Sequence, residues 1–296
     1  MRRLGAVRGE ASARARAALG LVGPACLWLL AFFVIPLVLI FRLSFFGFSP
    51  TAGILSTPEL GNYVKIASDD YYVGIFLRTI RTSLLVTAFT LLLGYPEAYF
   101  LTRIRGRAKA IVLVAVLSPL IVSAITRTFG WFILLAPNGL VNAVIVGLGL
   151  SDTPLKLIYS ETGIVIGLTH VLVPFMVLSI YAALQRRDPA LVSAAQTLGA
   201  GPLRSFLAIT LPLSLPGVVA GSVVVFTLSM SAFVTPAILG GTRVRVVAYL
   251  VYEEFLFSLN WPFGAALALT LLVITMAVVL GYHRWLERGR WSEVFR

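Results

Sequence analysis

Residues 163–184 read GIVIGLTHVLVPFMVLSIYAAL and contain no lysine, arginine, aspartate or glutamate. About 20 apolar residues in an α-helix are enough to cross the hydrocarbon core of a bilayer. Inside lipid a helix satisfies its own backbone hydrogen bonds, whereas an isolated strand does not. The stretch therefore predicts a transmembrane helix.

Five further runs of similar length and polarity lie on either side of this one. They cover 19–46, 79–101, 110–135, 213–239 and 263–285, and no connector between them is long enough for a soluble domain. The apolar stretch 139–150 is too short to cross and is predicted to be interfacial or re-entrant. The sequence thus predicts an all-α integral membrane protein with about six transmembrane helices. Its domain organisation is a basic N-terminus (1–18), one membrane domain (19–285) and a short tail (286–296).

The composition excludes other classes of protein. The chain has 296 residues, of which 59% are hydrophobic and 12% charged, whereas soluble domains are about 45–50% apolar and about 25% charged. A soluble globule, a disordered chain and a nucleic-acid-binding role are all excluded, so no nucleic acid is expected as a partner. The first apolar run is too long for a cleaved signal peptide and has no A-x-A cleavage site, so we expect an uncleaved first span. The single cysteine, Cys26, excludes an intramolecular disulfide and is expected to pack in the core.

The net charge of +12 follows from the predicted topology. Arginine and lysine gather in the N-terminus, in the connectors 102–109 and 185–212, and in the tail, while the alternate connectors are slightly acidic. Cytoplasmic loops of membrane proteins carry an excess of basic residues. We therefore predict that both termini and these two connectors are cytoplasmic. The charge also favours attraction to anionic membrane lipid and gives no information about the solute.

The motifs of common enzymes are missing from the sequence. None of the three lysines lies in a phosphate-binding G-x-x-x-x-G-K-[ST] loop, no H-E-x-x-H or Cys/His cluster predicts a metal site, and no serine lies in a G-x-S-x-G turn. We predict no catalytic residue and no bound cofactor, and elimination favours transport. The alternative is a self-sufficient secondary carrier or channel, but such carriers often show internal repeats with paired interrupted helices, and we find no repeat.

The connector 185–212, QRRDPALVSAAQTLGAGPLRSFLAITLP, encodes a short helix with defined ends. Asp188 is suited to cap the free N–H groups at the start, and Pro189 suits the first helical position. Gly199 is suited to the left-handed conformation that ends a helix. A second helical unit opens at Gly201-Pro202. The first helix carries an apolar stripe that predicts a docking surface on the cytoplasmic side: Leu191, Ala194, Ala195 and Leu198.

The same connector carries a family resemblance. Ala194-Ala195, three residues, Gly199, nine residues and Ile209-Thr210-Leu211-Pro212 are similar to the signature E-A-A-x(3)-G-x(9)-I-x-L-P of permease subunits of binding-protein-dependent ABC importers. Ser193 stands where the family usually has glutamate, which puts an acidic contact with the ATPase in doubt. The resemblance extends over most of the chain and is to the spermidine/putrescine branch, on the stretches 61–63, 93–99, 174–178, 211–217, 233–241 and 260–268.

The resemblance implies a type I importer permease in a bacterial cytoplasmic (inner) membrane. Its implied partners are a second permease, an ATPase dimer that binds ATP and Mg²⁺, and an extracytoplasmic solute-binding protein. The expected solute is a polyamine, with amino-acid-like, opine, phosphonate and other small organic solutes as alternatives. The helix from Asp188 to Leu198 would be the coupling helix. The residues expected to take part in ATPase coupling are Asp188, Leu191, Ser193, Ala194, Ala195, Leu198, Gly199, Arg204 and Phe206.

Polar residues inside the predicted spans are further candidates, because ionisable groups in a membrane usually face protein or water. Arg127 either faces the permeation path or reaches the outer interface near Trp131. His170 either lines a cavity near Pro174 or is a packing residue. Ser229 and Ser231 either border the pathway or bond to a neighbouring helix. We carry all five as pathway candidates: Arg127, Trp131, His170, Ser229 and Ser231.

Three acids of the outer connectors complete the candidate set: Glu161, Glu253 and Glu254. They would either attract a polyamine at the interface with the binding protein, contact basic residues of that protein, or be solvated. The family resemblance favours the last two, because it implies that the binding protein selects most of the solute.

Overall fold

The structure is a computed structural model that describes residues 20, 22–186 and 188–288. Within these residues six helical segments are long and apolar enough to cross a membrane, as the sequence predicts. The predicted N-terminal segment 1–18 and most of the predicted tail lie outside the described residues. The six segments are Val22–Leu43, Asp70–Arg103, Ala124–Gly147, Glu161–Gln185, Pro202–Ser231 and Trp261–Tyr282.

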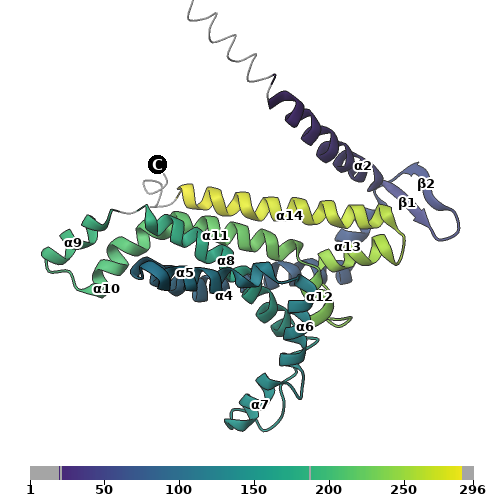
Figure 1. The fold of residues 1–296 in the computed structure, drawn as a ribbon. Helices are drawn as coiled ribbons and strands as arrows, with labels where there is room; N and C mark the ends of the chain where they lie inside the picture. The colour runs from purple at the N-terminus through teal and green to yellow at the C-terminus, as the bar shows by residue number, and fades with distance from the viewer. Residues whose placement is uncertain (1–19, 21, 187, 289–296) are drawn as a thin grey trace, which may run out of the picture.

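Three helices form the centre of the bundle: α4 (Asp70–Arg103), α8 (Glu161–Gln185) and α11 (Leu211–Ser231), which lie side by side (Figure 1). Their buried contact includes Val86, Met176 and Val225, each with no exposed surface. At Gly217 of α11 a Cβ would lie only 2.6 Å from the backbone oxygen of Ser179. Small residues permit such close helix contacts in membranes, where apolar burial alone does not drive association.

A second core joins α3 (Gly61–Ser68) and the first turns of α4 to α13 (Val247–Leu256) and α14 (Trp261–Arg288). The rings of Tyr72 and Phe263 pack edge to face with centroids 5.1 Å apart. The backbone N–H of Val247 donates to Oγ1 of Thr79 at 3.0 Å. These contacts fix α13 and α14 against one end of α4.

The predicted third span, 110–135, is wrong in its bounds. The chain forms α5 (Gly106–Ile121), breaks at Val122 and Ser123, and continues as α6 (Ala124–Leu135) and the short α7 (Leu140–Gly147). The candidate span in this region is α6 with α7, not one helix from 110. Val122 and Ser123 have extended ψ values of 137° and 136°, so α5 ends at Ile121, two residues after Pro119.

A small hairpin between the first two spans was not predicted. Strands β1 (Phe46–Ser49) and β2 (Gly53–Pro58) pair antiparallel, and Gly53 has a φ of +73° in the turn. The side-chain amide of Asn62 donates to the carbonyls of Ser44 (3.0 Å) and Phe46 (2.9 Å). This long-range anchoring of a four-residue strand is invisible in local sequence patterns.

Two short π-helical segments each end two residues before a proline. They are η1 (Leu30–Val34), before Pro36, and η2 (Phe206–Thr210), before Pro212. A proline lacks an N–H and its ring clashes with the carbonyl four residues earlier, which favours a π-type rearrangement of the preceding turn. The predicted fifth span also ends early, because α11 stops at Ser231 and α12 (Val234–Leu239) is separate.

The bundle has two different ends (Figure 1). One end carries α9 (Pro189–Thr197) and α10 (Pro202–Ser205), and the other carries β1, β2 and α13. The last turns of α14 lie at the α9 end. Helix α2 (Ile35–Leu43) runs away from the bundle and, with η1, has no buried residue. Cys26, which precedes η1, is exposed, so the prediction that it packs in the core is wrong.

Candidate functional site

Helix α9 has the caps that the sequence predicts. Oδ1 of Asp188 accepts a hydrogen bond from the backbone N–H of Ala190 at 2.9 Å, which satisfies one of the free donors of the first turn. Gly199 has a φ of +84°, and the N–H of Ala200 returns to the carbonyl of Ala195 at 2.9 Å. A residue other than glycine would be strained at that φ. The helix is therefore held at both ends by local interactions.

The apolar residues of α9 are open to the surroundings. Leu191 is 46% exposed and Leu198 is 89% exposed, while Ala195 is half-buried. A hollow of about 260 Å³ lies beside them, lined in part by Ala195, Leu198 and Arg204. Ser193 and Ala194 are also exposed. The predicted coupling residues on α9 thus form one accessible surface with a shallow hollow at its edge.

Phe206 of η2 is placed differently from the residues on α9. It is half-buried, and its ring packs edge to face against Tyr95 and Tyr99 of α4, with centroids 5.8 Å and 5.4 Å apart. The hydroxyl of Tyr95 also bonds to Oγ of Ser214 at 2.9 Å. Phe206 therefore links the connector to the central bundle.

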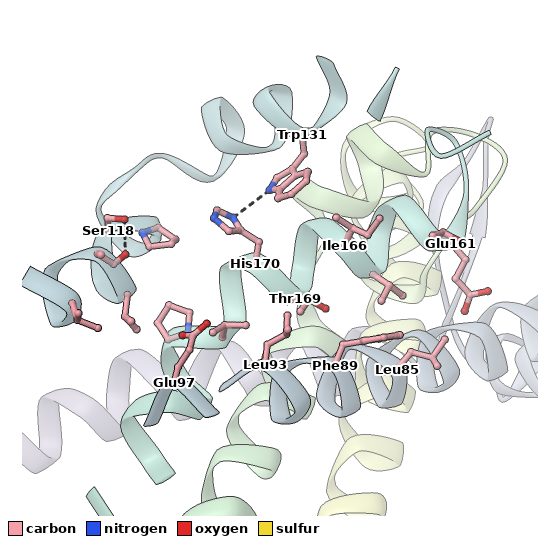
Figure 2. A pocket seen from close by; sticks show the side chains of 18 of the residues that line it. Leu85, Phe89, Leu93, Glu97, Ser118, Trp131, Glu161, Ile166, Thr169 and His170 are labelled. Atoms are coloured by element: carbon pink, nitrogen blue, oxygen red, sulfur yellow. Dashed lines mark hydrogen bonds between the residues drawn. The ribbon is translucent and has the colours of Figure 1, made fainter. Parts of the chain in front are cut away.

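A cavity of about 920 Å³ lies between α4, α5 and α8, with Trp131 of α6 on its wall. Figure 2 shows Leu85, Phe89, Leu93 and Glu97 following one face of α4, which is the spacing of one residue per turn. Two of the predicted pathway residues meet on another wall: Nε1–H of Trp131 donates to Nδ1 of His170 at 3.2 Å (Figure 2). Both residues were predicted as pathway candidates, but the hydrogen bond between them was not predicted.

Arg127 does not line this cavity. Its guanidinium donates to the backbone carbonyl of Pro119 and, at 3.4 Å, to that of Val122. These carbonyls belong to the last turn of α5 and the break after it, where no intrahelical donor is present. Neither predicted role, pathway or outer interface, anticipated this contact: Arg127 of α6 caps α5 across the break.

The two serines lie away from Trp131 and His170. Ser229 is 5% exposed and its Oγ has no hydrogen-bond partner among the described residues. Oγ of Ser231 donates to the carbonyls of Thr227 and Leu228, each at 3.2 Å. Neither serine lines the 920 Å³ cavity.

The three predicted acids occupy two separate places. Glu161, at the start of α8, pairs with Arg81 of α4, whose Nε donates at 3.0 Å, and accepts from Oγ1 of Thr82 at 2.9 Å. Glu253 of α13 pairs with Arg245, which precedes this helix, at 3.4 Å. Burial raises the pKa of the Glu254 carboxyl, an effect that Ser258 and the charge of Lys65 reduce. Glu161 is the one of the three that lines the cavity.

Glu97 is a site residue that the sequence reasoning did not select. It lies in an apolar stretch of α4 next to Pro96, is half-buried, lines the cavity and has no ion pair with any described residue. The signal that would have found it is an acid inside a predicted span, which is costly unless it serves a site.

Comparison with known proteins identifies the family. Residues 110–291 match the family model described as the binding-protein-dependent transport system inner membrane component. The chain belongs to this family. It is 31% identical over 257 residues to the spermidine/putrescine transport system permease protein PotB of Escherichia coli, covering 87% of this chain and 93% of that protein. It is also 32% identical over 232 residues to the inner membrane ABC transporter permease protein YdcU of Escherichia coli, covering 74% of each.

Solved structures share the fold. A bacterial ABC transporter involved in the import of the acidic polysaccharide alginate aligns with a TM-score of 0.71 at 17% identity, covering 95% of this chain and 98% of that chain. The alginate transporter in complex with an alginate-pentasaccharide-bound periplasmic protein aligns with a TM-score of 0.70. The predicted type I permease fold is therefore confirmed, and this chain is a multi-pass inner-membrane permease of an ABC importer.

Proposed function

We propose that this chain forms half of the membrane pathway of an importer for an aliphatic polyamine, and that α9 docks on a cytoplasmic ATPase. The observation that carries the coupling role is the exposed surface of α9. A helix that merely joined two spans would be more stable with Leu191 and Leu198 covered, since each Å² of apolar surface left in water costs about 25 cal/mol. Capping at both ends gives this surface the rigidity that a docking element requires.

The remaining parts of the importer follow from this role. The chain has no phosphate-binding loop, so ATP and Mg²⁺ would be bound and hydrolysed by an ATPase dimer. A second permease would complete the pathway, and an extracytoplasmic binding protein would deliver the solute. The α9 end of the bundle would face the cytoplasm, together with both termini.

Movement of the ATPase would reach the bundle by two routes. One is covalent, through α10 and η2 into α11. The other is the ring contact of Phe206 with Tyr95 and Tyr99, which connects the coupling region directly to α4. Both routes end on helices of the central core, so displacement of α9 would change the packing of α4 and α11.

The choice of a polyamine rests on similarity to the spermidine/putrescine permease over most of the chain. The test is uptake of radiolabelled spermidine by proteoliposomes that contain the complete importer with its ATPase, second permease and binding protein. We expect ATP-dependent uptake that unlabelled putrescine inhibits and that an inactive ATPase abolishes. Intact ATP hydrolysis without uptake of spermidine or putrescine would overturn the polyamine assignment.

A further inference from the structure

Glu97 lies within the candidate span Asp70–Arg103, and its carboxylate has no ion pair with any described residue. It lies six residues before Arg103, about 9 Å along the axis of α4 at 1.5 Å per residue. Arg103 itself donates to the hydroxyl of Tyr99 and lies over its ring, with Cζ 4.9 Å from the centroid. The nearest basic residue along the chain is therefore occupied elsewhere, and an ionised acid at this depth is stabilised by a mobile cation or by water.

The other acid of the cavity is already neutralised. Glu161 lies at the far end of the cavity, where it pairs with Arg81. Arg81 and Glu97 are sixteen residues apart on α4, or about 24 Å along the helix axis. The attraction for a positive charge is thus concentrated at the Glu97 end.

Thr169 supplies a second polar group without a partner. It is 6% exposed, it lines the cavity, and its Oγ1 forms no hydrogen bond with any described residue. A buried threonine hydroxyl in a helix commonly bonds to the carbonyl of the preceding turn. Here the hydroxyl oxygen is itself enclosed by protein, so Thr169 adds an unpaired polar group to the wall between α4 and α8 and offers no open contact to a ligand (Figure 2).

The remaining walls suit the hydrocarbon part of an amine. Phe89 and Trp131 line the cavity, and aromatic rings bind ammonium groups and methylene chains alike. Nδ1 of His170 accepts from Trp131, so the imidazole carries its proton on Nε2 and adds no positive charge. Arg127 is directed to the carbonyls of Pro119 and Val122. The volume of about 920 Å³ lies within the range of small-molecule sites, about 300–1,000 Å³.

From this arrangement we propose that the cavity between α4, α5 and α8 is an intramembrane binding site for an aliphatic amine. Glu97 pairs with an ammonium group, and the apolar and aromatic walls hold the methylene chain of the same molecule. The site lies toward the end of α4 that bears the coupling contacts, so it binds the solute near the point of release to the cytoplasm. This inference rests on the proposed polyamine function and names a solute site for it within this chain.

The test uses a cysteine on the cavity wall of the assembled importer. Cys26→Ser removes the chain's native thiol, and Ser118→Cys places a thiol on α5, beside the cavity and close to Pro119. Two thiol reagents of similar size are compared: the cationic methanethiosulfonate ethylammonium and the anionic methanethiosulfonate ethylsulfonate. We expect the cationic reagent to react about tenfold faster relative to its reaction with free thiol, because a fixed negative charge concentrates cations locally.

Substitutions at Glu97 test whether its carboxylate causes the faster reaction of the cationic reagent. Glu97→Gln has nearly the same shape and is expected to abolish the preference, whereas Glu97→Lys is expected to reverse it. Asp152→Asn, which removes an exposed acid of an outer connector, is the matched control and keeps it. Spermidine in the millimolar range slows labelling when Glu97 is present and does not do so in Glu97→Gln, with sodium chloride at equal ionic strength as the salt control.

Four outcomes would overturn the site: equal rates for the two reagents, a preference that survives in Glu97→Gln, no protection by spermidine, or no labelling at all. No labelling would indicate that lipid or protein fills the cavity, and each of the other three outcomes would show that Glu97 does not hold an amine there. Spermidine uptake is measured in the same vesicles. If uptake is absent while Glu97-dependent protection is present, the polyamine importer is wrong and the amine site stands.

Discussion

Phe206 packs edge to face on Tyr99, with ring centroids 5.4 Å apart and an interplanar angle of 78°. The contact joins η2, which follows the proposed coupling helix, to the part of α4 that carries Pro96 and Glu97. An aromatic pair of this geometry contributes about 0.5–1.5 kcal/mol beyond the apolar area that it buries. The ring contact therefore connects η2, which follows the proposed docking helix in the chain, to the part of α4 that lines the cavity.

Loss of this contact is expected to uncouple transport from hydrolysis. Phe206→Ala should leave the ATPase bound but reduce spermidine uptake per ATP hydrolysed by about tenfold, since a loss of roughly 1.4 kcal/mol in coupling free energy has that effect. Leu207→Ala, which truncates an exposed neighbour in the same turn, is the control. If Phe206→Ala and Tyr99→Ala reduce coupling independently and additively, the ring contact does not transmit the movement.

The surface of α9 gives a second prediction. Ala195→Asp places a carboxylate in the proposed contact with the ATPase, at a penalty of about 1–3 kcal/mol or more, and should reduce ATPase co-purification and stimulated hydrolysis. Gly199→Val should act by strain, because its φ of +84° is strongly unfavourable for a β-branched residue. Normal coupling in both variants would show that α9 is not the contact.

Ser193 offers the opposite change at the same surface. Ser193→Glu restores the acid that the family usually has at this position, and the side chain at 193 is exposed. The substitution should strengthen ATPase co-purification at low ionic strength, and the gain should decrease with added salt because exposed charges are screened. A loss of binding on Ser193→Glu would show that the partner has no basic group there.

We expect the main effect of substituting Arg127 to be a loss of stability, with any effect on transport following from it. Arg127→Ala leaves the carbonyls of Pro119 and Val122 without their donor at the break between α5 and α6. Unpaired backbone groups cost about 1–3 kcal/mol each when buried, so the thermal stability of the purified complex should fall. Arg127→Lys keeps the charge but not the planar fork and should recover only part of the loss. Unchanged stability in Arg127→Ala would rule out the capping role.

Glu254 provides a pH test outside the membrane spans. Burial raises its pKa above the usual value, so the folded state binds this proton more tightly than the unfolded state does. The contribution of Glu254 to the free energy of unfolding is therefore most favourable at low pH, where the carboxyl is protonated in both states. It is lost as the pH rises from the pKa of the unfolded state, about 4.3, through the raised pKa of the folded state. Glu254→Gln should therefore raise the melting temperature by up to a few degrees at pH 7 and by less at pH 4. An equal effect at both pH values would contradict this.

The sequence predicted the parts of the fold that depend on local composition. The apolar runs gave six spans, and Asp188, Pro189 and Gly199 gave the ends of α9, because caps act over two or three residues. The hairpin of β1 and β2 was missed because Asn62, sixteen residues away, holds its first strand. The break after α5 was missed because 110–135 has only one charged residue, Arg127, and that residue, which stabilises the break, was interpreted as a pathway candidate.

The same distinction applies to the candidate site, where single residues could be predicted but their long-range contacts could not. Trp131 and His170 were selected singly as polar residues in spans, but their contact needs the packing of α6 on α8. Glu161 was assigned to the outer surface because its partner Arg81 is eighty positions away. Glu97 was not selected, although an acid beside Pro96 in an apolar helix carries the signal, because the stretch 93–99 was read for its family resemblance.

The account depends most on the docking of α9 to an ATPase, and a cross-link measures that contact directly. In membranes that contain the assembled importer with Cys26→Ser, Ala195→Cys is treated with a short bifunctional thiol reagent against a cysteine in the ATPase groove. We predict a cross-linked permease–ATPase species whose yield changes when ATP is added, and none from Asp152→Cys, which lies on an exposed connector beyond α7. No cross-link from Ala195→Cys, or an equal yield from Asp152→Cys, would contradict the proposal that α9 couples this permease to ATP hydrolysis.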